Sequence, residues 1–243
     1  MDINHFRTKH TVLTSIAIKH IFFDLDRTLW DFEQNSRNTL AELYEEYKLQ
    51  ELGYTGFEQF FDIYRSKNEI CWALYRENRL SKESMRSKRF KMSLQEVGHT
   101  GNTLAATLGK EYVLRSPRQT LLMEGSTEVL EYLAPRYNLH IITNGFEEVQ
   151  HIKMKACKID HYFGQVITSE RAGSKKPHPG IFEFAFRLTK ARPVESVMIG
   201  DDHDIDVAGA QRAGMTGIHY APGRETPGNG NTIRHLRELM ELF

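Results

Sequence analysis

KHIFFDLD, residues Lys19 to Asp26, is a short apolar run that ends abruptly in two aspartates. Runs of this kind are typical of buried strands in parallel sheets. Four later stretches have the same character: Asn138–Asn144, Gln165–Glu170, Ser196–Asp202 and Gly217–Tyr220. Helical patterns precede or separate them, at Ser126–Tyr137, Glu147–Lys158, Pro179–Lys190 and Ile205–Ala213. This alternation of strand and helix predicts an α/β fold built on a doubly wound parallel sheet.

The segment between the first strand and the other four has a different pattern. Its apolar residues recur at helical spacing, as in Leu40, Leu43, Tyr44 and Tyr47, and no part of it is convincing as a strand. We therefore expect an all-helical domain to be inserted into the sheet domain.

The expected boundaries follow from these patterns. The sheet domain is predicted at 18–32 and 120–243, and the helical insert at 33–119. Residues 1–17 are expected to form an N-terminal extension, because they contain no apolar run typical of a signal peptide. A last short helix is predicted at Thr232–Phe243.

Composition excludes several functional classes. Lysine plus arginine and aspartate plus glutamate balance at 32 each in 243 residues, so nothing points to nucleic acid or an anionic membrane as a partner. The two cysteines suggest neither a disulfide framework nor a zinc site. No stretch approaches the roughly 18 apolar residues of a membrane span. We expect a cytoplasmic protein.

Polar residues stand at the carboxyl ends of four predicted strands. They are Asp24 and Asp26, Thr143 and Asn144, Ser169 and Glu170, and Asp201 and Asp202. In open α/β sheets the ligand binds outside the carboxyl ends of the strands. We therefore expect these side chains to converge in one crevice.

The aspartate pair points to a cation. Asp24 and Asp26, two residues apart, are close enough to repel each other unless a cation lies between them, and Asp201 can add a third carboxylate. Mg²⁺ prefers such hard oxygen ligands and often binds phosphate oxygens as well. A lone DxD is more often a pair of solvated turn acids, but its place directly after a strand favours a metal site.

The remaining candidates fit a phosphate ligand. Thr143 and Asn144 can donate hydrogen bonds to a phosphoryl oxygen, although either can also be an ordinary helix cap. Lys176 can offset negative charge. It is preferred to Lys175 because it adjoins a proline, and the alternative is an exposed loop lysine. Asp206 can orient Lys176 or a metal-bound water.

Taken in order, these residues resemble a known family. DLDRT, ITN, the lysine of KKPHP, and GDDHDID look like the four signature motifs of the haloacid dehalogenase-like (HAD) hydrolase superfamily. The resemblance implies a Rossmann-like core with a helical cap inserted after the first motif. It covers nearly the whole chain beyond the N-terminal extension. Arg27 departs from the glycine that many members have there, at a position that tolerates variation.

The resemblance also implies roles for single residues. Asp24 is similar to the family nucleophile, and Asp26 to the general acid/base whose backbone carbonyl binds Mg²⁺. Asp201 would bind the metal. The supporting roles would fall to Thr28 in the first turn, Thr143 and Asn144 at the phosphoryl group, Lys176 as the charge-stabilising cation, and Asp206 nearby.

The segments TLWDFEQNS and TNGFEEVQHIKMKACKIDHYFGQVITSERAGSKKPHPGIF resemble the pyrimidine 5′-nucleotidase branch. The expected function is thus Mg²⁺-dependent hydrolysis of a phosphomonoester through an aspartyl-phosphate. The expected substrate is a small phosphorylated metabolite such as a nucleoside monophosphate, and the protein is expected to be a monomer or homodimer. The alternatives are a sugar-phosphate phosphatase, a phosphomutase, a metal-independent dehalogenase and an aspartate-phosphorylated receiver module.

Overall fold

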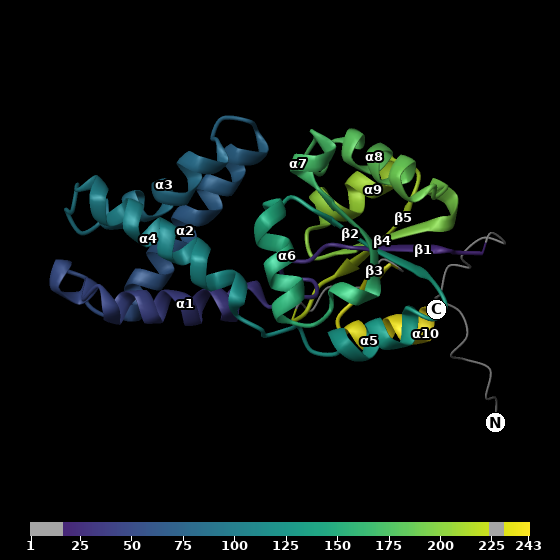
Figure 1. The fold of residues 1–243 in the computed structure, drawn as a ribbon, viewed down its shortest axis with the longest axis horizontal. Coiled ribbons are helices and arrows are strands. Elements are labelled where there is room, and N and C mark those ends of the chain that lie inside the picture. The colour runs from purple at the N-terminus through teal and green to yellow at the C-terminus, as the bar shows by residue number, and fades with distance from the viewer. Residues whose placement is uncertain (1–16, 224–230) are drawn as a thin grey trace, which may run out of the picture. The chain divides into compact units, whose positions relative to one another are not determined.

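The computed structural model describes residues 17–223 and 231–243, which pack as two compact units (Figure 1). We call them the sheet unit and the helical unit. The sheet unit contains the described residues before Asp31, residues 122–147 and the described residues from Ile159 onward. The helical unit contains residues 31–121 and 148–158. Apart from Ala17, the expected N-terminal extension lies outside the described residues.

The sheet has six parallel strands in the order β3-β2-β1-β4-β5-β6, which confirms the predicted α/β fold class. The strands are β1 (His20–Phe23), β2 (Asn138–Thr143), β3 (Phe163–Thr168), β4 (Ser196–Gly200), β5 (Thr216–Tyr220) and β6 (Thr232–Ile233). The strand β1, which directly precedes Asp24, lies between β2 and β4. The apolar side chains of β1 are buried because a strand lies on each side of it and helices cover both faces of the sheet.

Helices cover the two faces of the sheet (Figure 1). On one face lie α8 (Pro179–Thr189) and α9 (Ala208–Arg212), and on the other α5 (Ser126–Leu133) and α10 (Leu239–Leu242). On the first face, Phe22 and Met198 of the strands pack into one apolar cluster with Phe182 of α8. Burial of such side chains holds the strand ends in place.

Three sequence predictions for the sheet unit were wrong in detail. Thr232–Phe243 is not one helix: it contains β6, a 3₁₀ turn at Leu236–Glu238 and α10. Thr232 and Ile233 extend the sheet because they pair with β5, which buries Ile233. Gln165–Glu170 is not all strand, since Thr168 ends β3 and caps the short helix α7 (Ser169–Ala172). The helix predicted at Ile205–Ala213 is α9 preceded by a π-helical turn at His203–Val207.

The helical unit contains α1 (Phe32–Glu46), α2 (Phe57–Arg76), α3 (Lys82–Gln95), α4 (Asn102–Arg115) and all of α6 (Glu147–Ala156) except its first residue. Side-chain caps begin two of these helices: Asp31 accepts from the Gln34 N–H of α1, and Ser81 from the Ser84 N–H of α3. Aromatic and leucine side chains of α1 to α4 form the core of this unit. This unit also contains 3₁₀ turns at Leu49–Leu52 and Ser116–Arg118. The sheet unit has two further 3₁₀ turns, at Asp160–Tyr162 and Pro193–Glu195.

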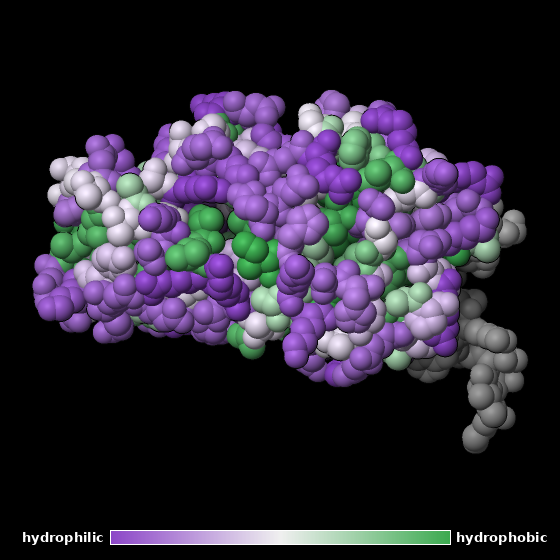
Figure 2. Space-filling model, in the orientation of Figure 1, coloured by the Kyte–Doolittle hydropathy of each residue, from purple (hydrophilic) through white to green (hydrophobic). Residues whose placement is uncertain are grey.

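The face of the protein seen in Figure 2 is mainly hydrophilic, with scattered apolar residues. Among the described residues, the large apolar side chains with substantial exposure are Ile70, Leu114, Leu121 and Val194. None of the helices within 17–223 and 231–243 is long and apolar enough to cross a membrane.

Candidate active site

Three of the candidate site residues lie at the carboxyl ends of three neighbouring strands. Asp24 follows β1 directly, Thr143 is the last residue of β2, and Asp201 follows β4. The strands are parallel and adjacent, so their carboxyl ends meet at one edge of the sheet. Residues more than a hundred positions apart in the sequence are thereby brought together.

Lys176 is the centre of this arrangement. Its ammonium group lies 2.6 Å from Asp24 Oδ1 and 2.6 Å from Asp206 Oδ1, and it donates to the Ile142 carbonyl at 2.8 Å. The ammonium group donates hydrogen bonds to Asp24 and to the Ile142 carbonyl, whereas its contact with Asp206 is an ion pair. With only 2 % of its surface exposed, Lys176 is a buried cation that joins the nucleophile candidate to a second carboxylate.

Asn144 fixes the backbone of Lys176. Its side-chain Nδ2 donates to the Lys176 carbonyl at 3.0 Å, and its Oδ1 accepts from the Lys176 N–H at 2.8 Å. The side chain that was expected to hold a phosphoryl group is therefore engaged by the loop that carries the cation. This gives Asn144 a positioning role that its place after β2 did not reveal.

Asp206 is held from two sides. Besides the ion pair with Lys176, its Oδ2 accepts from the Asp202 N–H at 3.2 Å. The space for its side chain exists because residue 200 is glycine: a Cβ at Gly200 would collide with the Asp206 carboxylate. The lack of a side chain at residue 200 therefore permits the close approach of the Asp206 carboxylate to the backbone.

Three carboxylates form a cluster that can hold a cation. One oxygen of each of Asp24, Asp201 and Asp206 lies within 4.8 Å of the others. Lys176 compensates one of the three negative charges, so a divalent cation would neutralise the remaining two. Hard oxygen donors at this spacing fit Mg²⁺. Among the described residues the cluster does not include Asp26, for which the expected metal ligand is the backbone carbonyl.

The ionisation of the cluster shows the same need for positive charge. Burial is the main factor that raises the pKa of Asp24 well above its ordinary value; Lys176 opposes this, while Asp206 and Asp201 add to it. Burial and the Asp206 charge raise the pKa of Asp201 to about 7, against the effect of Arg27. Burial alone would lower the pKa of Lys176, but Asp206 and Asp24 raise it, so the ammonium stays charged.

The other predicted site residues are Thr143, Thr28 and Asp26, and they differ in their local partners. Thr143 Oγ1 accepts from the Gly145 N–H at 3.0 Å, which orders the turn after β2. Thr28 is fully buried, and its hydroxyl has no hydrogen-bond partner in the described structure. Asp26 forms an isolated β-bridge with Trp30, which closes the loop between them. In this loop Arg27 has a left-handed backbone conformation, with a φ of 65°.

Two supporting interactions could not be identified from the sequence. The Ile142 carbonyl that accepts from Lys176 is a backbone atom of an apolar residue. Glu170 accepts from the Glu147 N–H at 2.7 Å, at the beginning of α6. Glu170 was singled out as a polar strand end, but its partner could be identified only from the fold.

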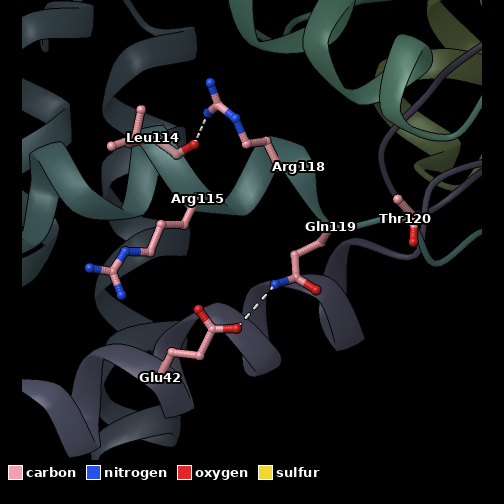
Figure 3. A pocket seen from close by; sticks show the side chains of 6 residues that line it. All are labelled: Glu42, Leu114, Arg115, Arg118, Gln119 and Thr120. Carbon is pink, nitrogen blue, oxygen red and sulfur yellow. Dashed lines mark hydrogen bonds between the residues drawn. The ribbon is translucent and has the colours of Figure 1, made fainter.

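The helical unit has a pocket of its own. It is lined by Glu42, Leu114, Arg115, Arg118, Gln119 and Thr120, and its volume is about 530 Å³ (Figure 3). Its polar groups largely bind one another: Gln119 donates to Glu42, and Arg118 to the Leu114 carbonyl. None of these residues was predicted to take part in catalysis.

Several known phosphatases are similar to this chain in sequence. The Pyrimidine 5′-nucleotidase PynA of Streptococcus pneumoniae is 27 % identical over 206 residues, which cover 84 % of each chain. The Pyrimidine 5′-nucleotidase YjjG of Escherichia coli is 25 % identical over 229 residues, which cover 92 % of this chain and 96 % of YjjG. Other relatives are phosphatases named for ribulose 1,5-bisphosphate and glyceraldehyde 3-phosphate.

Among solved structures, the HAD-hydrolase YfnB of Bacillus subtilis, bound to magnesium, matches with a TM-score of 0.83 at 24 % identity. The match covers 93 % of this chain and 98 % of YfnB. Several 2-haloacid dehalogenases share the fold as well. The model of the haloacid dehalogenase-like hydrolases matches residues 21–219, a span that includes β2 to β4, all but one residue of β1 and of β5, and all the predicted site residues. The chain belongs to the haloacid dehalogenase-like hydrolase family.

Proposed function

We propose that this enzyme is a Mg²⁺-dependent phosphomonoester hydrolase that works through an aspartyl-phosphate on Asp24. The observation that carries the proposal is the buried Asp24 carboxylate, 2.6 Å from Lys176 and within a cluster of three carboxylates. A carboxylate so placed can act as a nucleophile once positive charge keeps it ionised. The same positive charge favours an anionic substrate such as a phosphate ester.

In the first step, a carboxylate oxygen of Asp24 attacks the phosphorus in line. The bond between phosphorus and the leaving oxygen breaks, and Asp26 donates a proton to that oxygen. Lys176 stays protonated and offsets charge at Asp24 throughout, because its own ion pairs hold it as an ammonium. Asn144 keeps Lys176 in place through the two hydrogen bonds to its backbone.

In the second step, Asp26 accepts a proton from water, and the water oxygen attacks the phosphorus. The bond between phosphorus and Asp24 breaks, which releases inorganic phosphate and restores the carboxylate. Asp24, Asp201 and the Asp26 carbonyl are the groups proposed to hold Mg²⁺, and Thr143 and Asn144 those proposed to contact the phosphoryl group. When bound, the ion supplies charge neutralisation and in-line alignment of the phosphoryl group.

The substrate proposed is a nucleoside monophosphate, and more narrowly a pyrimidine one. The support is the likeness to PynA and YjjG over most of the chain, together with the segments after Asp24 and Asn144 that resemble the nucleotidase branch. Sugar phosphates are the second candidate, since relatives of comparable identity are named for them.

The first experiment measures release of inorganic phosphate from p-nitrophenyl phosphate, with Mg²⁺ and after chelation. We expect turnover only with the metal, and loss of turnover in Asp24→Asn. Asp160→Asn is the matched control, because Asp160 is an exposed carboxylate in a 3₁₀ turn of the same unit. Equal rates for Asp24→Asn and wild type, with no response to metal, would refute the proposal.

The second experiment resolves the substrate class. A panel of pyrimidine and purine nucleoside monophosphates and of sugar phosphates is assayed at one concentration with Mg²⁺, and kcat/KM is compared. We expect the pyrimidine monophosphates to rank first. Recovery of an isomerised sugar phosphate instead of free phosphate would identify a mutase, and halide release from a 2-haloacid without metal would identify a dehalogenase.

A further inference from the structure

His219 lies on β5, next to the strand that delivers Asp201. It is the register partner of Gly200, and the pairing of β4 with β5 ends at this pair. Its ring Nε2 lies 3.0 Å from the backbone carbonyl oxygen of Asp201. Because a carbonyl oxygen can only accept, Nε2 carries the proton and donates.

The peptide unit between Asp201 and Asp202 is held at both ends. Its carbonyl accepts from His219 at 3.0 Å, and its N–H donates to Asp206 Oδ2 at 3.2 Å. Asp201 lies one residue beyond the end of β4, where strand pairing no longer orients the backbone. The His219 imidazole therefore gives the Asp201 carbonyl a hydrogen-bond donor where the backbone of β5 no longer supplies one.

This peptide links β5 to the nucleophile through a continuous series of polar contacts. The series runs from His219 through the peptide to Asp206, from Asp206 to Lys176 at 2.6 Å, and from Lys176 to Asp24 at 2.6 Å. Two of the three clustered carboxylates belong to residues attached to this peptide: Asp201 supplies its carbonyl, and Asp206 accepts from its N–H. A rotation of the peptide plane would move both of them relative to Asp24.

We propose that His219 is a positioning residue of the active site, which keeps the carboxylates of Asp201 and Asp206 at the spacing that a divalent cation requires. The inference rests on the proposed function, because it assigns the role toward Mg²⁺. Groups that orient metal ligands through hydrogen bonds commonly affect metal affinity by 10- to 100-fold. His219 acts through a backbone carbonyl, so the lower end of that range applies.

The test compares two substitutions of His219. His219→Phe keeps a flat ring of similar size but removes the donor, whereas His219→Gln retains a side-chain N–H. His161→Phe, at an exposed histidine in a 3₁₀ turn of the same unit, is the control. The dissociation constant for Mg²⁺ is measured by calorimetry on each metal-free protein, and urea unfolding without metal reports whether each variant is folded.

We expect His219→Phe to raise the Mg²⁺ dissociation constant about tenfold and His219→Gln to restore it to within about threefold of wild type. The rate at saturating Mg²⁺ should change less than the rate at low Mg²⁺. A folded His219→Phe with the wild-type dissociation constant, or a folded His219→Gln as weak as His219→Phe, would overturn the inference alone. A wild-type protein that neither binds Mg²⁺ nor hydrolyses p-nitrophenyl phosphate would overturn the proposed function, and the inference with it.

Discussion

Lys176 in the sheet unit and Arg89 in the helical unit are both buried cations, and they are stabilised in opposite ways. Lys176 in the sheet unit is 2 % exposed and contacts two carboxylates and a carbonyl. Arg89 in the helical unit is 5 % exposed, and no carboxylate within 17–223 or 231–243 pairs with it. Instead it donates to Asn68 Oδ1 at 3.0 Å and lies 4.5 Å from the centre of the Tyr112 ring.

The difference separates a site for chemistry from a site for packing. The site at Lys176 has three carboxylates and one ammonium group, so it lacks positive charge and can bind a further cation. At Arg89 the rings of Tyr64, Phe90 and Tyr112 surround the charge, which is always present on a guanidinium, and cation–π attraction offsets part of its desolvation. The excess charge at the Asp24 site is therefore negative and open to a cation, whereas the charge of Arg89 is positive and enclosed by rings.

The largest effect should come from Asp24→Asn. Removal of the nucleophile is expected to lower kcat on p-nitrophenyl phosphate by about 10⁴-fold or more. The free energy of unfolding without metal should stay the same or rise, because the variant has one carboxylate fewer in a crowded cluster while Lys176 keeps its pair with Asp206. Urea unfolding and steady-state kinetics measure the two quantities. A marked loss of stability would mean that the cluster is not short of positive charge.

Lys176→Met should affect both activity and stability. It leaves Asp24 and Asp206 buried without their cation, which is expected to cost about 3–5 kcal/mol of unfolding free energy. We expect kcat to fall by about 10²- to 10³-fold, because charge at the reacting group is no longer offset. A variant as stable as wild type in urea at pH 7 would contradict the view that the acids depend on Lys176.

His140 is a third buried titratable residue. Its ring lies 4.8 Å from the Phe22 ring and 5.4 Å from the His20 ring, and no carboxylate of the described residues pairs with it. Burial, and then the neighbouring His20, lower the pKa of His140 to about 4, below the unfolded value of about 6.5. Stability from the neutral ring is therefore present above pH 6.5 and is lost as the pH falls toward 4. Between pH 7 and pH 4.5 we expect wild type to lose about 2 kcal/mol more unfolding free energy than His140→Gln. Parallel losses in urea titrations at the two pH values would rule this out.

Arg89→Met should have the smallest effect. A buried charge exchanged for an apolar side chain of similar length often changes stability little, since lost contacts are balanced by lower desolvation cost. We expect a change below about 1.5 kcal/mol, against about 3–5 kcal/mol for Lys176→Met. Paired urea titrations of the two variants measure the contrast directly. Similar losses at the two positions would erase the distinction between them.

Several features of the fold and site could be predicted because they are written locally in the sequence. The apolar run before Asp24 and the similar runs later in the chain identify the strands, and parallel strands place their polar ends at one edge. Helical spacing of apolar residues likewise predicts the helices between 33 and 119. Of the two lysines weighed from the sequence, Lys176 is the one whose ammonium group contacts Asp24 and Asp206.

Other features have no local signal. The strand β6 is two residues long, too short for any periodicity, and exists because β5 offers an open edge. The hydrogen bonds between the Asn144 side chain and the Lys176 backbone join residues 32 positions apart. The hydrogen bond from His219 to the Asp201 carbonyl joins residues 18 positions apart. Hydrophobic periodicity reports which face of an element is buried, but says nothing about which distant polar group it will meet there.

By itself, the sequence determined the kinds of elements, their order and the carboxylates that end the strands, because these depend on neighbouring residues and on the geometry of a parallel sheet. Only the tertiary structure decided how the charges are matched: three acids around one ammonium at Asp24, and aromatic rings around a guanidinium at Arg89. Charge pairing in a protein interior depends on distances between groups far apart in the chain, and packing alone sets those distances.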